Sequence, residues 1–150
     1  MSAVTDQSVC RVSVVTVCRN AGARLDATSA SVAAQGRADC EWLVIDGAST
    51  DDTVPRAEHW RGRIAGPVRI VSEPDGGIYD AMNKGLRLAR GEWVLFLNAG
   101  DGFADGDSLA RLLEVATADR VMVTARIRLM DSRDGFTAEA GEGFSWPGVA

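Results

Sequence analysis

Residues 40–53 read CEWLVIDGASTDDT, and this stretch decides the fold. Its first seven residues are mostly apolar and end in an acid, which is typical of a buried strand. Ser49 then stands three residues before Asp52, an arrangement close to a capping box, and Pro55 is tolerated only in the first turn of a helix. We therefore expect a helix to begin near Thr50. A strand that leads directly into a helix is the repeating unit of a parallel α/β sheet.

The same alternation of strand and helix extends on both sides of this stretch. Upstream, residues 9–18 are rich in β-branched side chains and predict a strand, and residues 22–35 show helical spacing before Gly36. Downstream, the patterns predict a strand at 68–74, a helix within 75–91, a strand at 92–97 and a helix within 105–118. Four such alternations predict an α/β protein with a mainly parallel sheet covered by helices on both faces.

Residues 120–144 alternate with period two around a Ser-Arg-Asp-Gly turn, which predicts a strand and a hairpin. A length of 150 residues suits one domain, and no repeat or linker divides the chain. We expect an N-terminal tail at 1–8, one domain at 9–125 and a short C-terminal hairpin and tail at 126–150.

Composition argues against several classes of protein. The net charge is −5 and the acids and bases are interspersed, which argues against a nucleic-acid surface. No uncharged apolar run approaches the roughly 18 residues of a membrane span, and the three cysteines have no Cys-x-x-Cys spacing, so we expect reduced thiols and a cytoplasmic location. His59 is the sole histidine, which leaves zinc chemistry poorly supplied. The glycine patterns of dinucleotide-binding and Walker phosphate loops are absent as well.

Polar clusters follow the four predicted parallel strands. They read TVCRN, IDGAST, SEPDGG and LNAGD, and they hold Asn20, Asp46, Asp75 and Asp101. Because α/β proteins bind ligands at the carboxyl ends of parallel strands, which share one edge of the sheet, we expect these side chains to converge. Asp101 is a candidate metal ligand with Asn98 nearby, since oxygen ligands suit Mg²⁺ or Mn²⁺. A helix cap and an ordinary turn residue are the alternatives for Asp101.

Three segments carry these motifs in order: VSVVTVCRN, WLVIDGASTDDT and SEPDGGIYDAMNKGLRLARGEWVLFLNAGD. They resemble the nucleotide-sugar-binding half of the family 2 glycosyltransferases, over roughly residues 10 to 125. The resemblance implies a Rossmann-like GT-A fold with three α/β/α layers. It also implies inverting transfer of a sugar from a nucleotide-diphosphate donor, commonly UDP-linked, to a glycan or lipid-linked acceptor, as in polysaccharide biosynthesis. A divalent metal, Mn²⁺ or Mg²⁺, is implied as the bridge to the donor's diphosphate.

The resemblance assigns several residues to the nucleotide of the donor. It places Thr16, Arg19 and Asn20 beside the base and ribose, and Arg19 stands where many members have an aromatic residue. A guanidinium can stack on a base or meet a phosphate. Asp46 matches the acid that accepts a hydrogen bond from the imide nitrogen of the base. The structural alternatives are a strand end and turn for Thr16 and Asn20, and a turn before a helix for Asp46.

Asp75 and Gly77 belong to a segment whose small residues let the backbone approach the donor closely, although an ordinary Asp-Gly turn is an alternative for Asp75. Asn83 is carried over from the following helix, on which Met82 replaces an arginine that often meets the diphosphate.

The family's aspartate-x-aspartate metal site falls on LNAGD. Asn98 and Gly100 occupy the two acid positions, and Asp101 follows as the implied metal ligand. One carboxylate and one amide oxygen can hold a metal if the diphosphate supplies further oxygens.

No residue is assigned as the general base, which in the family lies beyond the donor half. The acids of the predicted hairpin are expected to be solvated: Asp131, Asp134, Glu139 and Glu142. We expect the acceptor half to be missing, so the first hypothesis is a glycosyltransferase that is abbreviated or completed by a second chain or an oligomer. The second is a nucleotide-sugar-binding or partner-binding protein without turnover, and a regulatory doubly wound domain is a third. A lipid-linked acceptor would bring the protein to the inner face of the membrane.

Overall fold

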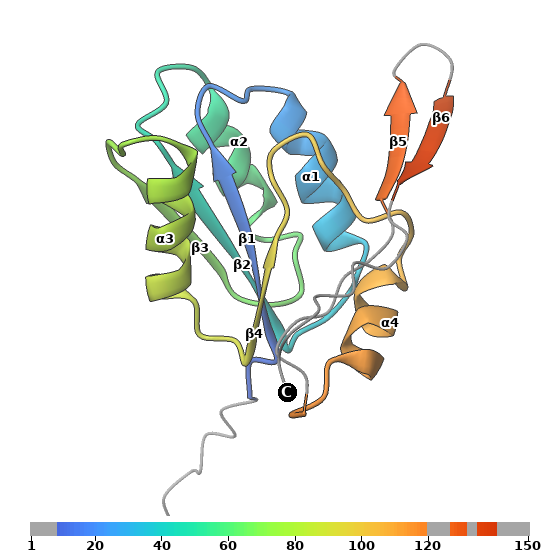
Figure 1. Cartoon of the computed structure of the whole chain (residues 1–150). Coiled ribbons are helices and arrows are strands. Elements are labelled where there is room, and N and C mark those ends of the chain that lie inside the picture. The colour runs from blue at the N-terminus through green and yellow to red at the C-terminus, as the bar shows by residue number, and fades with distance from the viewer. Residues whose placement is uncertain (1–8, 120–126, 132–134, 141–150) are drawn as a thin grey trace, which may run out of the picture. The chain divides into compact units, whose positions relative to one another are not determined.

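The computed structural model of the chain describes residues 9–119, 127–131 and 135–140. The chain forms two compact units, Met1–Gly106 and Asp107–Ala150. The first unit contains a four-stranded sheet in the order β3-β2-β1-β4 (Figure 1). Its strands are β1 (Val12–Cys18), β2 (Cys40–Asp46), β3 (Val68–Ser72) and β4 (Trp93–Phe96). All three pairings are parallel, which confirms the predicted parallel sheet.

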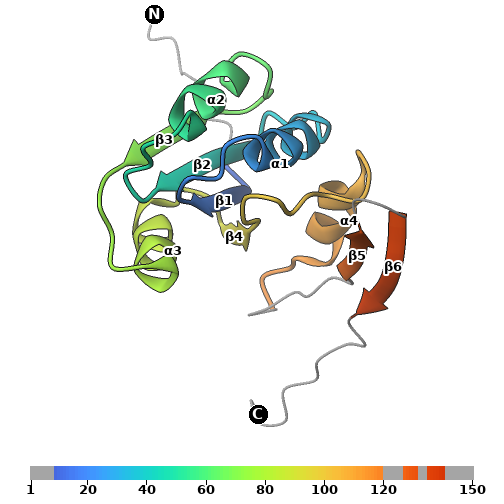
Figure 2. The same cartoon turned by 90° about the horizontal axis from the view of Figure 1, so that it is seen from above.

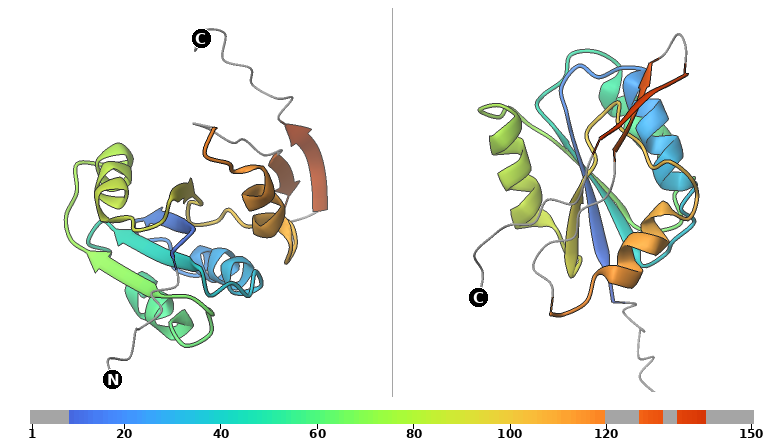
Figure 3. Two further views of the ribbon diagram at one scale, coloured as in Figure 1. Left: turned by 90° about the horizontal axis from the view of Figure 1, so that it is seen from below. Right: turned by 45° about the vertical axis from the view of Figure 1, so that its right-hand side comes forward.

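Three helices cover the two faces of this sheet. Helices α1 (Arg24–Ala33) and α2 (Thr53–Trp60) lie on one face, and α3 (Ile78–Leu88) lies on the other (Figures 2 and 3). The unit therefore has the expected three-layer α/β/α arrangement.

The core lies between the sheet and its helices, and β1 and β2 are its most enclosed strands. Val14, Val15, Leu43 and Ile45 have no exposed surface, because strands in the middle of a parallel sheet are covered on both faces. Gly85 brings α3 close to this core: a Cβ at that position would lie 2.5 Å from the Val15 side chain. The glycine in the middle of α3 is therefore required by packing, despite its low helix propensity.

Helix α2 begins at Thr53, three residues later than the sequence predicted. The expected capping role of Ser49 is wrong, because its hydroxyl instead donates to the Asp46 carboxylate. Asp52 occupies the N-cap position without a side-chain capping bond. The intervening residues form a loop whose hydrogen bonds run to the ends of β1 and β2.

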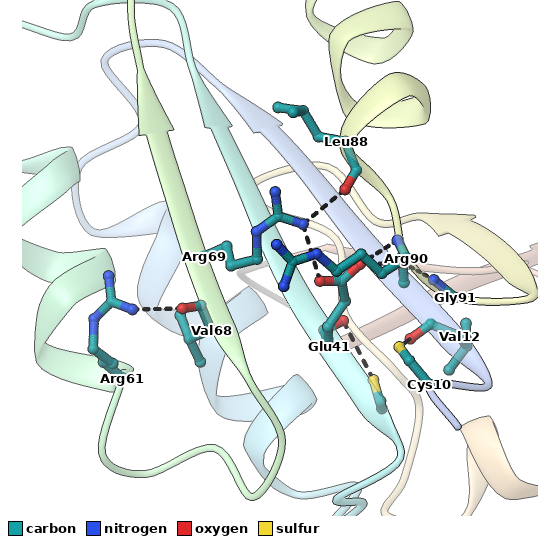
Figure 4. Close-up of polar contacts among 11 residues, drawn as sticks. Cys10, Val12, Glu41, Arg61, Val68, Arg69, Leu88, Arg90 and Gly91 are labelled. Atoms are coloured by element: carbon teal, nitrogen blue, oxygen red, sulfur yellow. Dashed lines mark hydrogen bonds and ion pairs between the residues drawn. The ribbon is translucent and has the colours of Figure 1, made fainter. Parts of the chain in front are cut away.

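A buried carboxylate lies at the opposite, amino end of the sheet (Figure 4). Glu41 is 2% exposed and accepts hydrogen bonds from the Ser13 hydroxyl and from the Arg90 backbone N–H, the latter at 2.7 Å. The Arg69 guanidinium lies 3.3 Å from Glu41 and also donates to the Leu88 carbonyl at 2.7 Å. Side chains from β1, β2 and β3 thus fix the connection that follows α3.

The second unit contains α4 (Ser108–Val115) and an antiparallel pair, β5 (Ile127–Asp131) and β6 (Gly135–Ala140) (Figure 1). The pair confirms the predicted hairpin. Residues 120–126, 132–134 and 141–144 of that predicted segment lie outside the described residues, and with them Asp134 and Glu142. Among the described residues, none of the helices has the length and apolar character needed to cross a bilayer.

Candidate functional site

The carboxyl ends of β1 to β4 lie at one edge of the sheet, where loops lead into α1, α2 and α3 (Figure 1). Asn20, Asp46, Asp75 and Asn98 stand at or just after the ends of β1, β2, β3 and β4, respectively. The topology therefore brings these four positions to a single edge.

Asp46, the last residue of β2, is fully buried and is the centre of a hydrogen-bond cluster. Ser72, at the end of β3, donates its hydroxyl at 2.6 Å, and the backbone N–H of Ser49 donates at 2.9 Å. The Ser49 hydroxyl is a third donor, and the Cys18 thiol, at the end of β1, lies 3.7 Å from Oδ1. Both carboxylate oxygens are therefore used inside the protein, and Asp46 as it lies has no exposed atom with which to meet a base.

Cys18 acts as a donor in this cluster because it keeps its proton. Burial, followed by the negative charge of Asp46, raises the pKa of the Cys18 thiol to about 12. At neutral pH the group is therefore a neutral thiol that can donate to the Asp46 carboxylate.

The loops after β1 and β2 are hydrogen-bonded to each other through Asn20. Its backbone N–H donates to the Ser49 hydroxyl at 2.7 Å, and its side-chain oxygen accepts the Thr50 N–H at 2.9 Å. Asn20 and Ala48 both have positive φ, at 48° and 55°. Such backbone strain in non-glycine residues is common at functional sites. Arg19, next to Asn20, is exposed at the same edge.

Thr53, the first residue of α2, binds the loop that follows β1. It is fully buried, and its hydroxyl accepts the N–H groups of Ala21 and Gly22, both at 2.9 Å. The sequence prediction overlooked Thr53, although a threonine at the expected start of a helix was the available signal.

Thr16 does not reach the candidate site. Its side chain is fully buried in β1, and its hydroxyl accepts a hydrogen bond from Trp42 Nε1 at 3.0 Å. The expectation that Thr16 lies beside a base is therefore corrected: the hydroxyl satisfies the indole N–H of a buried tryptophan, which needs a partner.

The loop after β3 packs against the loop after β2. A Cβ on Gly47 would lie 2.6 Å from Asp75 Oδ2, so only glycine lets the Asp75 carboxylate approach this closely. Asp75 is half-buried, and its Oδ1 accepts the Gly77 N–H at 2.9 Å. Gly77 has φ 114°, a conformation that L side chains rarely adopt. This loop leads into α3, on which Asn83 is exposed.

The turn at residues 98–101 follows β4. The Asp101 N–H donates to the Asn98 carbonyl at 2.9 Å, and Gly100 has φ 103°. The side-chain oxygen of Asn98 is buried, and it has no hydrogen-bond partner in the part of the chain that the structure describes. Asp101 is exposed. It does not cap α4, because that helix begins at Ser108.

These two side chains fit a divalent metal by the chemistry of their atoms. A buried amide oxygen without a hydrogen-bond partner is an acceptor left available, and Mg²⁺ and Mn²⁺ prefer oxygen ligands. Within the described ranges, no group of three or more His, Cys, Asp or Glu side chains could hold a metal alone. Asn98 and Asp101 would therefore share the ion with oxygens from a ligand.

Solved structures of similar fold are glycosyltransferases. A mannosyltransferase from Pyrobaculum calidifontis, in complex with GDP-Man and Mn²⁺, is 27% identical with a TM-score of 0.65, covering 72% of this chain and 33% of that one. TarS of S. aureus, in complex with UDP-GlcNAc, is 26% identical with a TM-score of 0.62, covering 69% and 30%. The chain thus has the GT-A fold.

The family model described as glycosyl transferase family 2 matches residues 13–145, so the chain belongs to this family. A PGL/p-HBAD biosynthesis glycosyltransferase of Mycobacterium bovis is 39% identical over 100 residues, covering 67% of this chain and 39% of the relative. An uncharacterized glycosyltransferase of Mycobacterium tuberculosis is 42% identical over 104 residues, covering 69% and 38%. The chain spans about two fifths of the length of these relatives.

Proposed function

We propose that this chain binds a nucleotide-diphosphate sugar, UDP-linked, at the strand-end edge and takes part in transfer of the sugar to a glycan or lipid-linked acceptor with inversion. The observation that carries the proposal is the turn at 98–101, where the buried Asn98 oxygen without a described partner neighbours the exposed Asp101. Membership of family 2 and the likeness to proteins solved with UDP-GlcNAc and GDP-Man support it.

The base and ribose lie, in this proposal, against the paired loops after β1 and β2. Arg19 is exposed there and can stack on the base or meet a phosphate. Asp75 reaches the same edge across Gly47, and a carboxylate suits the imide N–H of uracil. Asp46 contributes indirectly, because its buried carboxylate holds the strand ends from which these loops start.

The diphosphate lies toward α3 and the turn at 98–101. Gly77 keeps side chains away from the start of α3, and the helix N-terminus favours negative charge. Asn83 is exposed on the same helix. Lys84 is a weaker candidate, since its ammonium is already 2.8 Å from Glu73. Asn98 and Asp101 would hold Mn²⁺ or Mg²⁺, which neutralises charge on the leaving diphosphate when bound.

Isothermal titration of UDP, with MnCl₂ or with EDTA, tests the proposal. We expect tighter binding with Mn²⁺ in the wild-type protein, and loss of that gain in Asp101→Ala. Glu58→Ala is the control, because Glu58 is an exposed acid that pairs with Arg61 on α2. Failure to bind UDP under either condition would refute the donor site. A second assay measures the UDP released from a UDP-sugar in the presence of an acceptor. A transferase releases UDP in this assay, whereas a protein that only binds the donor does not.

A further inference from the structure

Polar side chains of α1 and of the turn after it contact the chain that follows β4. We define this polar stripe as Thr28 and Ser31 on α1 and Gln35, two residues beyond the end of the helix. Gln35 Nε2 donates to the Asp105 carbonyl at 2.8 Å. A Cβ on Gly102 would lie 3.2 Å from the Ser31 hydroxyl. Helix α1 and the turn after it therefore contact the segment that contains the candidate metal turn at three successive points.

Thr28 makes the contact with the turn itself. It is fully buried, and its hydroxyl lies 2.7 Å from the Asp101 carbonyl and 3.3 Å from the Asn98 carbonyl. The same hydroxyl accepts the Gly100 N–H at 2.9 Å. Because a hydroxyl has a single hydrogen, the shorter contact to Asp101 is the main donated bond. One side chain thus connects backbone groups at the two ends and the middle of the turn.

Thr28 bonds to the backbone of Asn98 and Asp101, the two residues whose side chains are the candidate metal ligands. The turn has one internal backbone bond, from the Asp101 N–H to the Asn98 carbonyl, and a glycine at φ 103°. Glycine adds conformational freedom that a second set of bonds must restrict. Thr28 supplies that restriction from a different element, and it does so without offering an exposed atom to a ligand.

We propose that Thr28 is a positioning residue for metal and diphosphate binding: its hydroxyl fixes the turn at 98–101 so that the Asn98 and Asp101 oxygens are presented together. This inference rests on the proposed donor site. Preorganised ligands bind more tightly because less ordering accompanies binding, so the effect belongs in the affinity for the metal.

The experiment compares Thr28→Val, which keeps the shape but removes the hydroxyl, with Thr28→Ser, which retains it. Ser29→Ala is the matched control, because Ser29 is the neighbouring buried hydroxyl on α1 and bonds to the Leu25 carbonyl instead. Each variant of this 150-residue chain is titrated with Mn²⁺ in the presence of UDP, and with UDP in the presence of EDTA. Hydrogen exchange of the peptide containing Gly100 reports the turn directly.

We expect Thr28→Val to raise the dissociation constant for Mn²⁺ by about tenfold, which is the size of one to two lost hydrogen bonds. The dissociation constant for UDP in EDTA should change little. Exchange at Gly100 is expected to accelerate, and Thr28→Ser should restore both values. The inference would be overturned if Thr28→Val bound Mn²⁺ as tightly as the wild type does. It would also be overturned if the variant lost as much UDP affinity in EDTA as it loses with Mn²⁺. Absence of metal-dependent UDP binding in the wild type would instead overturn the proposed function, while the exchange measurement still tests the hold of Thr28 on the turn.

Discussion

Hydroxyl groups hold the candidate site together at the scale of single residues. Ser49 and Ser72 bind the Asp46 carboxylate, Thr53 binds the loop after β1, and Thr28 binds the turn at 98–101. The sequence predicted the acids at the strand ends because acids after apolar runs are conspicuous. It did not predict which serine and threonine hydroxyls bind these acids and loops. A hydroxyl can donate or accept a hydrogen bond, and its position follows no periodic sequence pattern. The burial of Thr16 and Asp46 was overlooked for the same reason.

Ala48 provides a prediction at this scale, because its φ of 55° is a conformation that costs an L residue about 1–2 kcal/mol. Ala48→Gly removes that cost and adds about 0.5–1 kcal/mol of unfolded-state entropy, so the net gain in the free energy of unfolding lies between about 0 and 1.5 kcal/mol. Urea denaturation measures it. Ala30→Gly, at an exposed site within α1, should lower stability by about 1 kcal/mol. If both variants lose stability equally, the strain at Ala48 is not real.

The elements were largely predictable, because apolar periodicity located the strands and helices of the first unit and the hairpin of the second. The start of α2 was not. Ser49 has the spacing of a capping residue, but its hydroxyl bonds to the Asp46 carboxylate instead. A local sequence pattern does not reveal such a contact between a strand end and a loop. The positions that sequence patterns mispredict are thus those where separate elements meet at the edge of the sheet.

The Glu41 cluster at the amino end of the sheet offers a prediction for elements. Glu41→Gln keeps the volume but leaves Arg69 without its ion pair and places an amide where Glu41 accepts the Ser13 and Arg90 bonds. Removing one partner of a buried pair costs about 3–5 kcal/mol, and the partial exposure of Arg69 lowers the expected loss to about 2–3 kcal/mol.

Thermal and urea unfolding measure this loss. Glu58→Gln serves as the comparison, since it breaks an exposed pair with Arg61 and should change stability little. A Glu41→Gln protein as stable as the Glu58→Gln protein would show that the cluster does not hold the connection after α3.

For the whole molecule, alkaline pH is expected to be destabilising through two thiols. Burial raises the pKa of Cys18 and of Cys40 from 9.0 to about 12 each. Between pH 9 and pH 12 the two thiols keep their protons in the folded protein and lose them in the unfolded chain. The free energy of unfolding therefore falls as pH rises from about 9 toward 12, and the thiols do not change it below pH 9.

Urea midpoints at pH 8, 9 and 10 test this expectation. The double variant Cys18→Ala, Cys40→Ala should show a shallower decline over the alkaline steps, whatever its stability at pH 8. Parallel curves for the two proteins would mean that other groups account for the alkaline loss.

The class of fold and the family could be predicted at this scale, because four motifs in order are specific even where single residues are not. The acceptor and the general base could not. The chain spans about two fifths of the length of its curated relatives.

The central place of β1 has a consequence for how the protein is made. Val12 pairs with Cys40 on one side and with Trp93, much later in the chain, on the other. During synthesis β1, β2 and β3 can assemble early, whereas β4 must be translated and its long connection closed before it adds to the far side of β1. The turn at 98–101 follows β4 directly. We therefore expect the turn at 98–101 to be the last part of the strand-end edge to mature on the ribosome, after the loops that follow β1, β2 and β3 are already in place.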